Sequence, residues 1–310
     1  MNPIICIAGP TASGKTALAV EIAKLTNGEV VSCDSMQIYR RMTIGTAKPL
    51  PEEMQGIPHH MIDICEPGED FSVSRYCDMA TPIVEDIIAR GKTAIIAGGT
   101  GLYMDSLIRG NDFSPIPATG HRERLEKRIE TEGLGVLLQE LAAIDPESAA
   151  HSMRNPRRII RALEVYYESG ETITAHNLRT QSIPPKFSPL WIGLNFEPRA
   201  ALYARVNARV DIMLENGLLE EIKDLLASGI SPTCTAMQAI GYKEYVAYLR
   251  GETTLEEATE LLKMGSRRYA KRQLSWFRRN KDIHWLTRYP ETTYEEILNQ
   301  ARQLVLKTDN

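Results

Sequence analysis

The segment Gly9–Thr16 constrains the fold of this 310-residue chain more than any other feature. Its sequence, GPTASGKT, fits the phosphate-binding pattern G-x-x-x-x-G-K-[ST] at every fixed position. An apolar run of buried-strand type, Ile4–Ala8, precedes it, and an amphipathic helical pattern, Ala17–Leu25, follows it. A glycine turn between a strand and a helix aims backbone N–H groups and the helix N-terminus at one point. The chain is therefore predicted to bind a polyphosphate or a pyrophosphate at this turn.

Two side chains of this segment add charge and metal chemistry. Lys15 adds a point charge for the terminal phosphates of a ligand. The hydroxyl of Thr16 can bind Mg²⁺. Mg²⁺ is therefore the expected cofactor, with Thr16 as its ligand from the protein.

Short apolar strands alternate with helical patterns from residue 1 to about residue 109. The expected strands are Ile4–Ala8, Glu29–Cys33 and Thr93–Ala97, and the clearest helices are Ala17–Leu25 and Ser74–Arg90. This alternation predicts an α/β fold, namely a P-loop NTPase-like parallel sheet flanked by helices. The polar residues that follow the strands would then line the crevice where such sheets bind ligands.

A small all-helical insertion domain is predicted at residues 114–189, where the pattern is helical almost throughout. Prolines punctuate both of its ends, at Ser114–Pro117 and at Ile183–Pro185, as they do in linkers. An apolar strand pattern at Leu190–Asn195 then resumes the core. Residues 1–113 and 190–310 are therefore expected to form one domain, which ends in basic helices.

Capping residues mark helix boundaries inside the insertion. Asn155-Pro156 and Asp145-Pro146 each combine an N-cap side chain with proline at the first helical position. Gly170 is a good stop for the helix that starts at Asn155. That helix is expected to carry an apolar stripe on one face and arginines on the other.

The charge of the chain is unevenly distributed. The formal net charge of −4 would argue against a nucleic-acid partner. Basic residues nevertheless gather in two segments, Arg154–Arg161 and Arg267–Lys281. In the second segment, Arg268, Lys271, Arg272, Ser275 and Arg279 share one helix face, with aromatic residues between the charges. This face is predicted to bind a phosphate backbone.

Neither a membrane span nor a leader is expected. No run of about eighteen apolar residues occurs, and the N-terminus leads directly into the first strand without a basic segment. The five cysteines are scattered without metal-binding spacing, which is typical of reduced core thiols. We therefore expect a cytoplasmic protein.

Two polar segments admit both a functional and a local structural interpretation. Thr93–Ala97 ends in Gly98–Gly101 without an acidic residue, so Asp34 is the carboxylate expected nearest to the phosphate loop. Asp34 is either a general base or a turn residue, since Asp-Ser favours turns. Gly98–Tyr103 either permits close approach of a ligand or forms a tight turn, and its pattern by itself favours the turn.

The motifs occur in an order that is specific to one family. They are Gly9–Thr16, Asp34–Tyr39, Gly45–Pro49, His59–Asp63, Gly98–Tyr103, Arg161–Val165, Gln238–Lys243 and Arg267–Arg279. On these segments, which extend over nearly the whole chain, the protein closely resembles bacterial tRNA dimethylallyltransferases, also called tRNA isopentenyltransferases. The one departure at a motif position is Met61, where relatives usually carry leucine.

The resemblance implies transfer of a dimethylallyl group from dimethylallyl diphosphate to the exocyclic N6 amine of the tRNA adenine 3′-adjacent to the anticodon, with release of diphosphate. It makes Asp34 the general base, and Thr11 and Thr100 the hydroxyls that order the reacting centre. The residues that would bind the diphosphate are Gly9, Thr11, Ala12, Ser13, Gly14, Lys15 and Thr16. Arg205 and Arg209 lie four residues apart, hence on one helix face. They are candidate second clamps on the diphosphate, and a role at the protein surface fits their spacing equally well. The residues that would bind tRNA are Asp34, Ser35, Met36, Gln37, Thr100, Arg122, Arg157, Arg158, Arg161, Gln238, Gly241, Tyr242, Lys243, Arg268, Lys271, Arg272 and Arg279.

Two other functions fit parts of the sequence. A P-loop small-molecule kinase would use ATP, with Asp34 holding the acceptor hydroxyl, and would need no basic helix. A nucleotide-dependent RNA-binding switch would need elements that sense a γ-phosphate, and no segment resembles one. The expected partners are the anticodon stem-loop of tRNA and dimethylallyl diphosphate, and the protein is expected to be a monomer.

Overall fold

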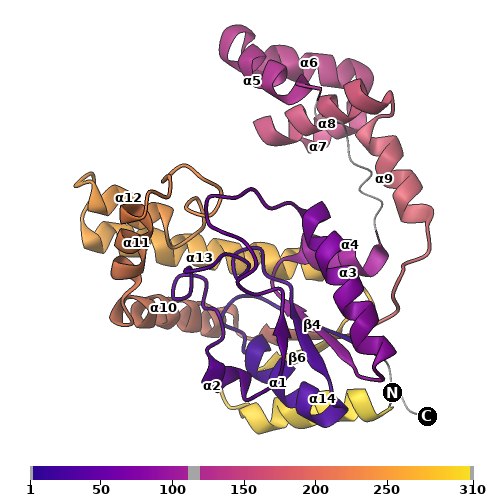
Figure 1. The fold of residues 1–310 in the computed structure, drawn as a ribbon, viewed down its shortest axis with the longest axis vertical. Helices are drawn as coiled ribbons and strands as arrows, with labels where there is room; N and C mark the ends of the chain where they lie inside the picture. Colours follow the sequence, from indigo (N-terminus) through magenta and orange to yellow (C-terminus); the bar gives the residue numbers. More distant parts are fainter. Residues whose placement is uncertain (1–2, 111–118, 308–310) are drawn as a thin grey trace. The chain divides into compact units, whose positions relative to one another are not determined.

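The computed structural model describes residues 3–110 and 119–307 and divides into two compact units. The first unit contains the chain up to Ile108 and again from Phe187 onward, and the second contains Arg109–Lys186. The chain leaves the first unit and returns to it at neighbouring residues, because the Phe187 N–H donates a hydrogen bond to the Ile108 carbonyl over 3.0 Å. Figure 1 shows the helices of the second unit as a continuous stretch of the sequence.

The first unit is built on a six-stranded parallel sheet with the strand order β3-β2-β4-β1-β5-β6. The strands are β1 (Ile4–Ala8), β2 (Glu29–Ser32), β3 (His59–His60), β4 (Ala94–Gly98), β5 (Leu190–Phe196) and β6 (His284–Arg288). Every residue of β1, β2 and β5 is buried, as expected for strands covered on both faces. The register places Ala8 beside Gly98, so β1 and β4 end at the same level, while β5 continues past Gly193, the other partner of Ala8, to Phe196.

Helices cover the sheet of the first unit. They are α1 (Lys15–Thr26), α2 (Pro51–Met54), α3 (Val73–Ala89), α4 (Gly101–Arg109), α10 (Arg199–Glu215), α11 (Leu218–Ala227), α12 (Lys243–Leu249), α13 (Leu255–Phe277) and α14 (Tyr294–Lys307). Helices α1 and α14 pack together on the sheet through Leu18, Ile22, Ile297 and Leu298 (Figure 1). A separate apolar cluster joins α11 and α12 to the segment that carries Tyr39.

The predicted α/β fold is confirmed, with shifts of one or two residues at the ends of the expected elements. Strand β4 runs from Ala94 to Gly98 rather than from Thr93 to Ala97. The sequence pattern did not reveal β3 or β6. Strand β3 has only two residues, and β6 lies at the sheet edge, where its polar and apolar residues give no clear strand signal.

The second unit contains five helices among the residues that the structure describes. They are α5 (His121–Glu132), α6 (Leu134–Ile144), α7 (Pro146–His151), α8 (Pro156–Ser169) and α9 (Ile173–Ser182). Helices α7 and α8 begin at the predicted residues, because the side chains of Asp145 and Asn155 accept hydrogen bonds from the N–H groups of Ser148 and Arg157. Gly170 ends α8 with a φ of 72°, a conformation that favours glycine.

The second unit has its own apolar core. Leu125, Leu137, Leu141, Ile159 and Leu163 are each at most 2% exposed and pack together. The predicted insertion spans 114–189, whereas the compact unit spans Arg109–Lys186. The expected linker at 114–117 lies outside the described residues. Within the described part of the chain, no helix is long and apolar enough to cross a bilayer.

Candidate active site

A cavity of about 330 Å³ lies within the first unit, at the edge where β1, β2 and β4 end. Its walls come from the phosphate loop (Thr11, Lys15, Thr16), Asp34–Gln37, Gly45–Ala47, Ala97–Gly98, Gln238–Gly241, and single faces of α10 and α13. Six of the motifs that the sequence singled out thus contribute to one place, while His59–Asp63 and Arg161–Val165 do not line it. This arrangement follows the general rule that ligands bind at the carboxyl ends of parallel strands.

The backbone of the phosphate loop depends on glycine at two positions. Gly14 has a φ of 92° and precedes the first residue of α1, so the loop turns sharply into the helix. Gly9 has a φ of 155°, and a Cβ there would lie 2.9 Å from the Leu194 carbonyl oxygen. The first two residues of α1, Lys15 and Thr16, line the cavity, so the N-terminus of α1 faces it and favours an anion there.

Lys15 lines the cavity together with Thr11 and Thr16 of the Gly9–Thr16 loop. Its Nζ donates a hydrogen bond to the Pro10 carbonyl oxygen over 2.7 Å. The pKa of Lys15 is lowered to about 7, mainly by burial and in addition by the nearby Arg209 guanidinium, while Asp34 opposes the shift. An anion bound beside Lys15 would favour its charged form.

The two arginines expected to clamp a diphosphate have different surroundings. Arg209 lines the cavity, and its Nη1 donates to the Thr11 hydroxyl over 3.3 Å. Arg205 does not line the cavity; its Nε donates to the Ala12 carbonyl oxygen over 3.0 Å. Arg209 can therefore contact a bound anion, while Arg205 supports the backbone of the loop.

Asp34 makes the contact of a turn residue and also faces the cavity. Its Oδ1 accepts a hydrogen bond from the Met36 N–H over 2.9 Å, which is a local turn contact. The same residue lines the cavity with the phosphate loop. The Thr100 hydroxyl accepts from the Ser35 N–H over 3.0 Å and thereby fixes the segment that carries Asp34.

The glycines of Gly98–Tyr103 are explained by packing within the protein. A Cβ on Gly98 would lie 2.0 Å from the Cys33 carbonyl oxygen, and one on Gly101 would lie 2.1 Å from the Trp276 ring. Only Gly98 of these two lines the cavity. Glycine is therefore needed in this turn because its backbone packs closely against Cys33, which follows β2, and against Trp276 of α13.

Gln273 connects the two glycine-rich turns, a role that the sequence did not indicate. Its Oε1 accepts from the Thr11 N–H over 2.8 Å, and its Nε2 donates to the Gly99 carbonyl oxygen over 3.0 Å. The side chain is 5% exposed, so the amide lies inside the molecule. Its place in the basic segment was the only available signal, and that signal suggested RNA contact.

Part of the segment expected to bind the base is occupied by contacts within the protein. The Gln37 amide accepts a hydrogen bond from the Ser32 hydroxyl and donates one to the Ala47 carbonyl oxygen. Ser35 and Met36 line the same cavity. Gln37 is therefore oriented before any ligand binds.

The motif Gln238–Lys243 divides between the cavity and the core. Gln238 and Gly241 line the cavity. Tyr242 is fully buried, and its hydroxyl donates to Glu221 over 2.7 Å. Lys243 is exposed, with its Nζ 4.0 Å from Glu244. Tyr242 therefore packs in the core next to the cavity wall and has no exposed surface that RNA could contact.

Helix α13 presents a basic surface. Arg268, Lys271, Arg272 and Arg279 are exposed. The Arg272 guanidinium lies 5.5 Å from the centre of the Tyr269 ring, and that of Arg279 lies 3.9 Å from the centre of the Trp276 ring. Both Arg272 and Tyr269 line the cavity. The basic surface thus begins at the mouth of the site and continues along α13.

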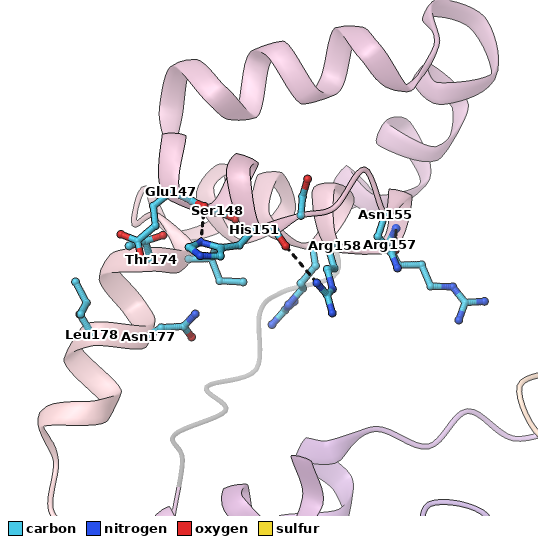
Figure 2. Close-up of a pocket in the computed structure, with 12 residues that line it drawn as sticks. Glu147, Ser148, His151, Asn155, Arg157, Arg158, Thr174, Asn177 and Leu178 are labelled. Atoms are coloured by element: carbon cyan, nitrogen blue, oxygen red, sulfur yellow. Dashed lines mark hydrogen bonds between the residues drawn. The ribbon is translucent and has the colours of Figure 1, made fainter. Parts of the chain in front are cut away.

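The second unit has a pocket of its own, of about 620 Å³, beside the N-terminus of α8. Figure 2 shows Arg157 and Arg158 extending from α8, with His151 and Asn155 nearby. The Nη1 of Arg158 donates to the His151 carbonyl oxygen over 3.2 Å. This pocket offers cationic groups to an anionic partner.

The other two arginines expected to bind tRNA in this unit share one acidic partner. Arg122 and Arg161 each form an ion pair of 2.9 Å with Glu164. Both guanidinium groups remain about half exposed. Because two guanidinium groups share one carboxylate, a net positive charge remains where α5 and α8 meet.

The residues around Thr16 fit a magnesium ion that would be held mainly by the phosphates of a bound substrate and only in small part by the protein. Thr16 lines the cavity with Asp34, and oxygen atoms are the ligands that Mg²⁺ prefers. No group of three or more His, Cys, Asp or Glu side chains suited to a metal occurs among the described residues. Mg²⁺ commonly uses one or two protein oxygens together with substrate phosphates, and the Thr16 hydroxyl is one such oxygen.

The fold and the cavity define a class of protein, namely a P-loop α/β protein in which a phosphate-binding turn and an apolar wall share one site. Comparison with known proteins then identifies the family. The sequence model of the family described as IPP transferase matches residues 37–280. The chain belongs to the IPP transferase family.

Curated relatives cover nearly the full length of the chain. The tRNA dimethylallyltransferase of Caldanaerobacter subterraneus is 50% identical over 297 residues, which are 95% of this chain and 94% of the relative. That of Acetivibrio thermocellus is 44% identical over 304 residues, 97% of each chain.

Solved structures of similar sequence support the same family. A tRNA isopentenylpyrophosphate transferase from Bacillus halodurans is 42% identical with a TM-score of 0.75, and the match covers 99% of this chain and 96% of that one. A eukaryotic dimethylallyltransferase acting on tRNA is 30% identical with a TM-score of 0.82, covering 100% and 79%. The kinase alternative is not favoured.

Proposed function

We propose that the protein transfers a dimethylallyl group from dimethylallyl diphosphate to the N6 amine of the tRNA adenine that follows the anticodon. The observation that carries the proposal is a single cavity that joins a phosphate loop, an apolar wall and the carboxylate of Asp34. The substrates are inferred from the names of the relatives, which mention tRNA and the dimethylallyl group. The walls of the cavity suit the phosphate, the apolar chain and the amine in turn.

The phosphate loop binds the leaving group and hydrolyses no nucleotide. The Lys15 ammonium and the Arg209 guanidinium line the cavity. Together with the backbone N–H groups of Ala12 to Gly14, they would stabilise the negative charge that increases as the diphosphate departs. Because these groups are fixed in advance, little reorganisation is needed at the moment of reaction.

Mg²⁺ would be held by the Thr16 hydroxyl together with oxygens of the diphosphate. When bound, the ion supplies electrostatic stabilisation of the departing phosphate charge. The position of Thr16 in the cavity wall, next to Lys15, supports this role.

An apolar wall adjoins the phosphate loop and suits a branched five-carbon chain. Val206 and Val210 of α10, Ile240 and Leu262 line this part of the cavity. Burial of the dimethylallyl group there keeps its C1 atom near the phosphate loop and excludes water, which would otherwise compete as nucleophile.

Asp34 accepts the proton that the amine must lose. The N6 lone pair attacks C1 of the dimethylallyl group, the C1–O bond breaks toward the diphosphate, and the N6 proton passes to the Asp34 carboxylate. General-base catalysis of this kind contributes typically ~10²–10⁴ in rate. The turn contact from the Met36 N–H orients the carboxylate without using both of its oxygens.

The RNA contacts follow from the need to extract the base. An adenine stacked in the anticodon loop has to leave the stack, at a cost of about a few kcal/mol, before it can reach a buried site. Arg268, Lys271 and Arg272 on α13, and Arg279 two residues past its end, bind the RNA backbone near the cavity. Arg157 and Arg158 of the second unit bind the anticodon stem, and one copy of the chain suffices for the reaction.

The test uses Mg²⁺, unmodified tRNA and either dimethylallyl diphosphate or ATP. The tRNA is digested afterwards, and its nucleosides are analysed by mass spectrometry. Prenylated adenosine formed without ATP is the expected product. ATP turnover with a small-molecule acceptor and no prenylated adenosine would contradict the proposal.

A further inference from the structure

Glu221 holds one wall of the cavity although it does not line the cavity itself. This carboxylate, on α11, accepts hydrogen bonds from three consecutive backbone N–H groups, those of Thr43 (2.7 Å), Ile44 (2.7 Å) and Gly45 (3.1 Å). The Tyr242 hydroxyl donates to the same carboxylate over 2.7 Å. Charge-assisted bonds of this kind are stronger than those between neutral groups.

The segment that Glu221 holds belongs to the cavity wall. Gly45, Thr46 and Ala47 line the cavity. A Cβ on Gly45 would lie 2.6 Å from the ring of Tyr242, which is fully buried. The carboxylate on one side and the tyrosine ring on the other therefore fix the position of this wall.

The same wall orients Gln37. The Gln37 Nε2 donates to the Ala47 carbonyl oxygen over 3.1 Å, and Gln37 follows Asp34 in one cavity-lining segment. Contacts of the phosphate loop come from elsewhere: Lys15 bonds to Pro10 and Arg209 bonds to Thr11. Glu221 is thus connected through hydrogen bonds to the segment that carries Asp34. It makes no such contact with Lys15 or Arg209, the groups proposed to bind phosphate.

We propose that Glu221 is a positioning residue for the acceptor base, acting through the wall Thr43–Ala47 on Gln37. The inference rests on the proposed function, since it assumes that the adenine enters beside Asp34–Gln37. It separates two tasks of one cavity. Glu221 governs the fit of the acceptor base, and the phosphate loop governs the binding of the donor.

The test compares Glu221→Gln with Glu220→Gln. Glu220 is the neighbouring residue, is exposed, and pairs only loosely with Lys223 at 3.6 Å, so it is a matched control. The amide in Glu221→Gln places an N–H₂ group against backbone or hydroxyl donors, which leaves donors unsatisfied. We expect the KM for an anticodon stem-loop to rise by about fivefold or more and kcat to fall, while the KM for dimethylallyl diphosphate changes by less than about twofold.

Hydrogen–deuterium exchange supplies a readout independent of activity. Peptides that contain Thr43–Gly45 are expected to exchange faster in Glu221→Gln and at the wild-type rate in Glu220→Gln. Tyr242→Phe removes one donor and keeps the carboxylate, so a smaller change in the same direction is expected. It also carries the test if Glu221→Gln does not fold.

Two results would overturn the inference. One is faster exchange of the wall with both KM values unchanged, which would make the contact purely structural. The other is an equal rise in both KM values, which would mean a general loosening of the cavity. A wild-type enzyme that makes no prenylated adenosine would instead refute the proposed function, and the inference would fall with it.

Discussion

The charge state of Lys15 gives a quantitative prediction about donor binding. Burial and Arg209 lower the pKa of Lys15 to about 7 in the free protein. A bound diphosphate places negative charge beside the ammonium, which raises this pKa toward its ordinary value. A group with a pKa of about 7 is protonated in roughly one molecule in eleven at pH 8, so binding takes up about 0.9 proton. At pH 6 the uptake by Lys15 falls to about 0.1 proton.

Isothermal titration calorimetry measures this uptake. Dimethylallyl diphosphate is titrated with Mg²⁺ at pH 8 in two buffers of different ionisation enthalpy, and the difference in apparent binding enthalpy gives the number of protons. At this pH the phosphate groups are already ionised, since their second pKa is about 6, so they contribute little to the proton count. Lys15→Arg is the control, because a guanidinium stays charged and the uptake should vanish. Uptake near zero by the wild type would refute the lowered pKa.

Three further predictions concern the base, the basic helix and the stability of the sheet. Asp34→Asn is expected to lower kcat by ~10²–10⁴ with little change in tRNA affinity; turnover within a few-fold of the wild type would mean that another group takes the proton. Changing Arg268 and Arg272 to glutamine should weaken tRNA binding and flatten its dependence on salt in a filter-binding assay, and an unchanged slope would remove α13 from the RNA-binding surface. The Arg90 guanidinium holds the pKa of Glu29 well below its usual range, so this carboxylate stabilises the fold above about pH 4.5, and the contribution is lost as the pH falls toward the folded value. Glu29→Gln should remove that part of the acid dependence of the free energy of unfolding in urea, and the same dependence in both proteins would contradict the assignment.

Local patterns predicted the parts of the molecule that local interactions determine. The phosphate loop was predicted because a few neighbouring residues fix its glycine turn and the start of α1. The starts of α7 and α8 were predicted because Asp145 and Asn155 cap the backbone three and two residues further on. Such contacts need no knowledge of tertiary structure.

Contacts between distant segments left no such pattern. Gln273 bonds to Thr11 across 262 residues of sequence, and Glu221 bonds to Thr43 across 178. Neither residue differs in periodicity from ordinary helix residues, so only the packing of α13 and α11 shows what each one holds. The same is true of Arg205 and Arg209: one helix face was predicted for both, but packing alone determines which of them reaches the cavity.

The hydrogen bond between Phe187 and Ile108 has a consequence for how such a protein can change. The chain departs from the core and comes back to it at adjacent residues, so the core needs nothing from the intervening 78 residues, Arg109–Lys186, to hold those two ends together. A few glycines joining Ile108 to Phe187 would keep both ends where they are. We therefore expect that residues 109–186 can be lengthened, shortened or exchanged while the core, with the residues proposed to bind the donor, keeps its fold.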